Sequence, residues 1–196
     1  MSNVLLLPGY SEGHHSVLLK SILSYFSQKN HVVHCYLKDE NKEDSRDYFF
    51  SKAYKAISAY EADYIIGKSW GGVLGLCIAD YYDQPVKGII ILGFPFLLGY
   101  PPQISLLKDR NPTLPDYKKE FRSVLNNLEK KQIPIYILQG DKDDLGPIYN
   151  LIKIADKFRN INVIPFAGSS HSFEVEEKKQ FFSIINEIEQ IISNDD

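Results

Sequence analysis

The chain has 196 residues, 44% of them hydrophobic, which is the size and composition of one globular domain with one core. Its net charge is −3, with acidic and basic residues interspersed, so the sequence predicts no basic surface for nucleic acid or anionic membranes. No apolar run approaches the length of a membrane span, about 18 residues, and no basic residue precedes the apolar run near the N-terminus. We therefore expect one cytoplasmic domain, residues 1–196, that acts on a small molecule.

Short apolar runs alternate with amphipathic segments along the whole chain. The runs predict buried strands of a parallel sheet over Asn3–Leu7, His31–Leu37, Asp63–Ile66, Val86–Leu92, Pro134–Leu138 and Asn162–Pro165. The amphipathic segments predict helices over Ser16–Gln28, Ser45–Tyr60, Trp70–Tyr82, Asp116–Lys131, Pro147–Phe158 and Phe173–Ser193. Alternation of this kind is typical of an α/β fold with helices on both faces of the sheet, a three-layer α/β/α sandwich.

One segment, Gly93–Pro115, interrupts this alternation. It contains five prolines and no sustained periodicity. Loops of this length in compact domains are often lids or binding loops, which is the functional interpretation. The alternative is a surface connection without a function of its own.

The pentapeptide Gly67-Lys68-Ser69-Trp70-Gly71 stands between a predicted strand and a predicted helix. A Gly-x-Ser-x-Gly sequence at such a turn is typical of a nucleophile elbow, in which glycines give the room that a sharp backbone bend needs. A phosphate-binding loop also ends in Gly-Lys-Ser, but it needs a glycine where this chain has Ala62. We therefore expect Ser69 to be a nucleophile at a helix N-terminus.

A serine nucleophile needs a base, and the base needs an orienting acid. Three aspartates, Asp141, Asp143 and Asp144, follow the predicted strand that ends at Leu138. In this region the chain resembles α/β hydrolases, many of which carry Gly-x-x-Asp in this loop and a proline at the start of the next helix. Gly140, Asp143 and Pro147 match that spacing, so the resemblance favours Asp143 as the acid, with Asp141 and Asp144 as alternatives.

Among the five histidines, only His171 follows the last predicted strand and precedes the terminal helix. The sequence His171-Ser172-Phe173 resembles the terminal motif of dienelactone-hydrolase-like proteins, which implies that His171 is the catalytic base. The order serine, aspartate, histidine is that of α/β hydrolases. The resemblance also implies an oxyanion hole made by the backbone amides of Trp70 and Tyr10, although Pro8 stands where the family usually has histidine.

The resemblance extends from Val4 to the terminal helix. Within the family, the chain is similar to the small KANL/Tex-type and dienelactone-hydrolase-like branches. This resemblance implies a minimal α/β-hydrolase fold with a six-stranded, mostly parallel sheet in the strand order 2-1-3-4-5-6. It also implies a serine hydrolase that cleaves a small ester or thioester without a metal or cofactor. We expect Phe94, Phe96 and Leu97 to form an apolar acyl pocket, with core packing as the alternative.

Two other interpretations remain open from the sequence. Some relatives with this fold have lost the triad and serve as interaction subunits, and such a protein would bind its partner through Gly93–Pro115. A lactone or dienelactone hydrolase, or a peptidase, would use the same triad on another substrate. The sequence does not indicate which oligomeric state the protein adopts.

Overall fold

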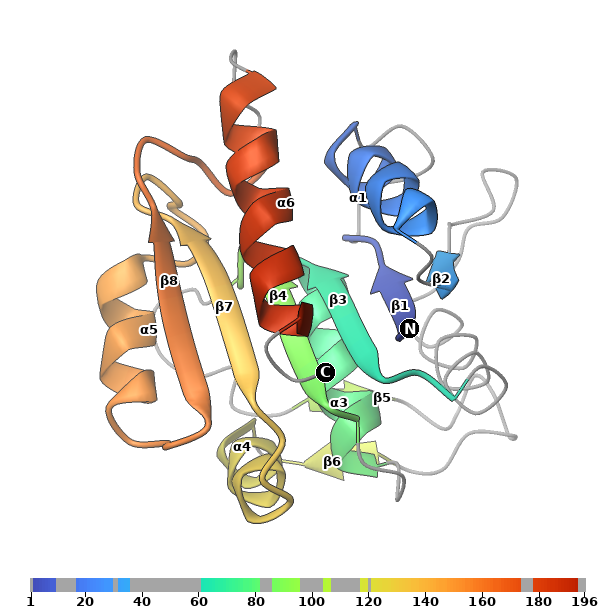
Figure 1. Ribbon diagram of the computed structural model, residues 1–196. Coiled ribbons are helices and arrows are strands. Elements are labelled where there is room, and N and C mark those ends of the chain that lie inside the picture. The colour runs from blue at the N-terminus through green and yellow to red at the C-terminus, as the bar shows by residue number, and fades with distance from the viewer. Residues whose placement is uncertain are drawn as a thin grey trace.

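The computed structural model describes residues 2–9, 17–29, 32–35, 61–81, 86–95, 104–106, 117–119, 121–173 and 178–193. Its main sheet has six strands in the order β2-β1-β3-β4-β7-β8 (Figure 1). All neighbouring strands in this sheet are parallel. The strands are β1 Asn3–Leu7, β2 Val32–Cys35, β3 Tyr64–Lys68, β4 Gly88–Leu92, β7 Ile135–Gly140 and β8 Ile161–Phe166. The predicted six-stranded parallel sheet and its strand order are therefore confirmed.

The strands at the centre of this sheet are buried on both faces, which explains their continuous apolar sequences. Every residue of β3 and β4 is buried. Alternate residues point to opposite faces, so Ile89 and Ile91 join one core cluster while Ile90 and Leu92 join the other. Parallel sheets covered on both faces have this sequence pattern.

Helices cover both faces of the sheet. Helices α1 (Val17–Gln28) and α6 (Lys178–Ser193) lie on one face, in front of the sheet in Figure 1. The opposite face is covered by α3 (Trp70–Tyr81), α4 (Phe121–Lys130) and α5 (Ile148–Ala155). No helix in the described part of the chain is both long and apolar enough to cross a membrane.

The central helix α3 is buried along most of its length, from Gly71 to Asp80. Its carboxyl end is tied to the turn after α4, because the amino group of Lys131 donates hydrogen bonds to the carbonyls of Ala79 (3.1 Å) and Asp80 (2.7 Å). A cationic donor at this end satisfies carbonyls that the helix itself leaves unpaired. This contact holds the carboxyl end of α3 against the turn after α4.

Two predicted helices begin later than the sequence suggested. Residues Tyr117–Lys119, placed in a helix from Asp116, form strand β6, which pairs antiparallel with β5 (Ile104–Leu106). Strand pairing with a distant segment overrides the local helical pattern there, and α4 starts only at Phe121. The long excursion after Gly93 thus contributes a two-stranded sheet of its own.

The terminal helix also departs from its predicted start at Phe173. This residue has φ 53°, a left-handed conformation that a helix does not use, and α6 begins at Lys178. The other described helices and strands agree with the predicted ranges to within a few residues at each end. The predicted helix Ser45–Tyr60 lies outside the described residues.

Candidate active site

Four loops that follow neighbouring strands carry the candidate residues. Ser69 follows β3, Gly93 follows β4, Asp143 follows β7 and His171 follows β8. The carboxyl ends of parallel strands lie at one edge of the sheet, which is where open α/β sheets place their ligand sites. The topology therefore brings these four positions to the same edge.

Ser69 lies in a tight turn between β3 and α3. Ser69 has φ 50°, its backbone N–H donates to Leu92 O at 2.9 Å, and its carbonyl accepts from Gly72 N at 2.9 Å. A Cβ atom on Gly67 would overlap the backbone of Gly72, and one on Gly71 would overlap the carbonyl oxygen of Leu7. Both glycines are thus needed for close backbone approach, as the elbow hypothesis expects.

The imidazole of His171 lies between Ser69 and Asp143. Its Nε2 is 2.8 Å from Ser69 Oγ, and its Nδ1 is 2.8 Å from Asp143 Oδ2. Because a carboxylate accepts hydrogen bonds, this contact favours the tautomer with the proton on Nδ1 and leaves Nε2 to accept from the serine hydroxyl. The side chain of His171 is 16% exposed and that of Asp143 is 0% exposed. The arrangement can therefore pass a proton from serine to histidine beside a buried negative charge.

The carboxylate of Asp143 is surrounded by donors. Its Oδ1 accepts from the backbone N–H groups of Leu145 (2.9 Å) and Gly146 (3.0 Å), and its Oδ2 accepts from Gln139 Nε2 (2.6 Å). Such contacts fix the orientation of the acid relative to the imidazole. The other two candidate acids are placed differently: Asp144 is exposed, and Asp141 is exposed and accepts from Gly168 N.

Gln139, which the sequence analysis did not select, is completely buried beside this acid. Its Nε2 also donates to Gly146 O at 2.7 Å, and its Oε1 accepts from Phe94 N at 2.8 Å. Every part of its amide is therefore engaged by the loops after β4 and β7. The signal in the sequence was a polar residue near the end of an apolar strand, directly before Gly140.

Lys68 is a second residue that the sequence analysis did not assign to the site. It is the last residue of β3, is only 2% exposed, and donates from Nζ to the carbonyl oxygen of His171 at 2.9 Å. Its Nζ also lies 5.9 Å from the centre of the Phe173 ring. Lysine is rarely buried to this extent. The sequence alone does not reveal this burial, because it depends on where strand β3 ends.

The remaining predicted residues are placed as follows. Trp70 is the first residue of α3, directly after Ser69. Phe94 is 2% exposed and stacks on Phe121, with ring centres 5.6 Å apart, within the core cluster that includes α3 and α4. Tyr10, Phe96 and Leu97 lie outside the described residues.

The family of the chain follows from a comparison of its sequence. A family model described as "Alpha/beta hydrolase domain" matches residues 38–194. The chain belongs to the alpha/beta hydrolase family. No curated protein sequence matches it.

Solved structures show the same fold at low sequence identity. Est1E from Butyrivibrio proteoclasticus is 12% identical, with a TM-score of 0.64 over 98% of this chain and 88% of its own. Alpha/beta hydrolase domain-containing protein 10 from mouse is 17% identical, with a TM-score of 0.67 over 98% and 90%. A thioesterase domain from the curacin biosynthetic pathway is 14% identical, with a TM-score of 0.64 over 94% and 90%.

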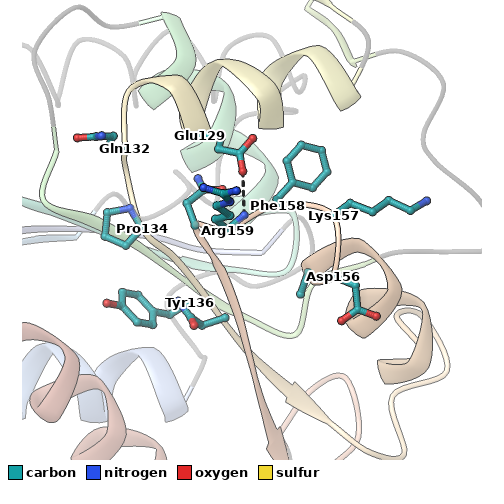
Figure 2. A pocket seen from close by; sticks show the side chains of 11 residues that line it. Glu129, Gln132, Pro134, Tyr136, Asp156, Lys157, Phe158 and Arg159 are labelled. Atoms are coloured by element: carbon teal, nitrogen blue, oxygen red, sulfur yellow. Dashed lines mark hydrogen bonds between the residues drawn. The ribbon is translucent and has the colours of Figure 1, made fainter.

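The alpha/beta hydrolase also has an open depression at the opposite end of the sheet (Figure 2). It has a volume of about 1080 Å³ and lies where β7 and β8 begin, beside Pro134 and Asn160. Arg159 N donates to Glu129 Oε1 at 2.8 Å at its rim. The depression contains none of Ser69, Asp143 and His171, so it is separate from the candidate active site.

Across the described ranges, no group of three or more histidine, cysteine, aspartate or glutamate side chains is arranged to bind a metal ion. The two ring nitrogens of His171 already contact Ser69 and Asp143.

Proposed function

We propose that this alpha/beta hydrolase is a serine hydrolase that cleaves a small ester or thioester through an acyl-enzyme. The observation that carries the proposal is the position of the His171 ring, with Nε2 2.8 Å from Ser69 Oγ and Nδ1 2.8 Å from Asp143 Oδ2. Serine needs a base within hydrogen-bonding distance, and the base needs an orienting acid. The distances support His171 as the proposed base and Asp143 as the proposed orienting acid.

The proposed reaction has two stages. Ser69 Oγ attacks the carbonyl carbon while its proton passes to His171 Nε2, and Asp143 stabilises the imidazolium that results. His171 then protonates the leaving alcohol or thiol, and the acyl group remains on Ser69. In the second stage His171 Nε2 accepts a proton from water while the water oxygen attacks the acyl carbon. His171 then returns this proton to Ser69 Oγ as the bond between Oγ and the acyl carbon breaks, and the acid is released.

Backbone amides are proposed to hold the oxyanion that forms in each stage. Trp70 opens α3, and the first N–H groups of a helix have no partner within that helix. Tyr10, after β1, is proposed as the second donor. Two such donors aimed at the developing charge are the usual arrangement in this kind of acyl transfer.

The proposed substrate class draws on solved structures that share the fold. Two structures with the same fold carry the names of an esterase domain from a Rhodothermus marinus protein and of a thioesterase domain. We propose that Phe96 and Leu97, after β4, line an apolar site for a short acyl chain, whereas the burial of Phe94 supports the core-packing alternative for that residue. We also propose that the chain belongs to the KANL/Tex-type and dienelactone-hydrolase-like branch, which the sequence His171-Ser172-Phe173 supports.

A fluorophosphonate probe tests the proposal directly, because it reacts with an activated serine. We expect the wild-type protein to be labelled and Ser69→Ala not to be labelled. Ser172→Ala is the matched control, since Ser172 Oγ contacts Ser170 Oγ and lies outside the proposed triad. Absence of labelling in the wild type, or equal labelling of Ser69→Ala, would overturn the enzymatic proposal in favour of a non-catalytic binding protein.

A substrate panel separates the remaining alternatives. Short esters and acyl thioesters should be hydrolysed by the wild type and not by Ser69→Ala. A preference for lactones, dienelactones or peptides on the same serine would replace the ester or thioester assignment while leaving the triad in place.

A further inference from the structure

Lys68 is the most deeply buried cationic side chain described near the candidate active site. It is 2% exposed, and Ser69 follows it directly in the chain. Moving an ammonium group from water into a protein interior is costly unless hydrogen bonds compensate. The reaction proposed above does not use Lys68, so it does not explain why this side chain is buried next to the nucleophile.

The carbonyl group of His171 supplies a partner for the lysine. Lys68 Nζ donates to this oxygen at 2.9 Å, across 103 positions of sequence. Hydrogen bonds from charged donors are stronger than those between neutral groups. The contact therefore ties the loop after β8 to the end of β3.

The loop around His171 is also tightly constrained by its neighbours. A Cβ atom added to Gly93 would lie 2.9 Å from His171 O and 3.4 Å from His171 Nδ1. Phe173 has φ 53°, and its N–H donates to Ser170 O at 3.2 Å, which closes a turn. The main chain of His171 is thus held between a glycine and a lysine amino group.

We propose that Lys68 is a positioning residue that acts through His171. Its amino group holds the main chain of His171, which keeps Nε2 within hydrogen-bonding distance of Ser69 Oγ. Lys68 and Ser69 are consecutive, so the end of β3 positions both the nucleophile and the main chain of its base, His171. The inference rests on the proposed function, because it needs His171 to act as the base.

Replacement of Lys68 by methionine keeps the unbranched stem and removes the donor. We expect kcat to fall about 10- to 100-fold, since a displacement of about 1 Å in a catalytic group can cost about 100-fold in rate. KM should stay within about twofold of the wild-type value, because substrate binding is not affected. The rate of fluorophosphonate labelling should fall in parallel with kcat.

Lys131→Met is the matched control. Lys131 also donates to backbone carbonyls, those of Ala79 and Asp80, but it lies at the far end of α3. Its loss should lower the free energy of unfolding and leave kcat unchanged. A purely structural role for Lys68 predicts the same behaviour for both variants.

A double-mutant cycle with His171→Ala provides the decisive measurement, with labelling rate as the readout. If Lys68 acts through His171, the double variant should label at the same rate as His171→Ala alone. Additive losses, or unchanged kcat in Lys68→Met, would overturn the inference. Should Lys68→Met not fold, Lys68→Gln takes its place in the cycle, and failure of both to fold would assign Lys68 to the fold and overturn the inference too.

The failure of the proposed function gives a different result. In that case the wild-type protein does not label at all, and no variant changes this. Labelling that depends on Ser69 and His171 but not on Lys68 would leave the proposed function standing and remove only the role of the lysine.

Discussion

Gln139 Nε2 lies 2.6 Å from Asp143 Oδ2, while Gln139 Oε1 accepts from Phe94 N at 2.8 Å. Strands β4 and β7 are neighbours in the sheet, so one buried amide joins the loops that follow them. The orientation of the acid and the course of the chain after β4 are thereby coupled.

Gln139→Leu should lower both stability and activity. It leaves the buried N–H of Phe94 and the carbonyl of Gly146 without the Gln139 amide, and each lost partner costs about 1–3 kcal/mol. It also removes one donor from Asp143, so we expect kcat/KM to fall about tenfold in addition. Chemical unfolding and ester hydrolysis measure the two effects. Gln190→Leu, at an exposed position of α6, should change neither, and a loss of stability without loss of activity would contradict the coupling.

Asp143→Asn should reduce kcat by about 10²- to 10⁴-fold, because the amide cannot stabilise the imidazolium as a carboxylate does. Asp141→Asn removes the same charge two residues away, at an exposed position whose described contact is with Gly168 N. This variant should retain activity within about twofold. Steady-state hydrolysis of the best substrate in the panel compares them, and equal losses would argue against the assignment of Asp143.

Gly71→Ala should destabilise the protein more than Gly75→Ala. A Cβ atom at Gly71 would overlap the backbone carbonyls of Leu7 and Pro8, which cannot move without shifting β1. At Gly75 the nearest atom is Ile65 Cγ2 at 2.9 Å, at the end of a side chain that can adjust. Overpacking of this kind typically costs about 1–3 kcal/mol, and we expect Gly71→Ala at the upper end or beyond it. Urea unfolding measures both losses, and a larger loss of stability in Gly75→Ala than in Gly71→Ala would contradict this prediction.

The contact between α1 and α6 should make the free energy of unfolding change with pH in the alkaline range. The hydroxyl of Tyr25 donates to Glu189, and this hydrogen bond raises the pKa of Tyr25 from 10.0, while the same carboxylate raises the pKa of Lys29 from 10.5. Groups whose pKa is raised by folding contribute stability below their unfolded pKa and lose it as pH rises through the folded value. The free energy of unfolding should therefore fall above about pH 10.

Glu189→Gln tests the origin of this pH dependence. The neutral amide removes the charge that favours protonation of both Tyr25 and Lys29, so the decline above about pH 10 should become shallower. Glu187→Gln removes an equal charge from the same helix and should keep the wild-type slope. Thermal or urea unfolding at several alkaline pH values gives the comparison, and identical slopes in all three proteins would refute it.

The sequence was sufficient for features that depend on local pattern. The apolar runs identified the six strands of the main sheet, because strands buried on both faces have few polar residues. Chain order then predicted loops after β3, β7 and β8 at one edge, where His171 lies within hydrogen-bonding distance of both Ser69 and Asp143. The strand order came from family resemblance, since periodicity contains no information on which strands are neighbours.

Features that depend on distant contacts were not accessible in the same way. The roles of Lys68 and Gln139 rest on hydrogen bonds to backbone groups 103 and 45 positions away, and no spacing within the sequence reveals such partners. The start predicted at Asp116 for the helix before β7 was wrong for a related reason, because Tyr117–Lys119 pairs with Ile104–Leu106 and α4 begins at Phe121. In each case the deciding interaction forms only when the chain folds back on itself.

Strands β4 and β7 pair directly, from Ile89 with Ile135 to Leu92 with Leu138, although more than forty positions separate them in the chain. The β5–β6 pair is inserted between them and adds no strand to the main sheet. The free energy of closing such an excursion changes slowly with its length, by about 0.6 kcal/mol for each doubling. Replacement of the residues between Pro95 and Phe121 by a segment of another length should therefore leave the register of β4 and β7 unchanged.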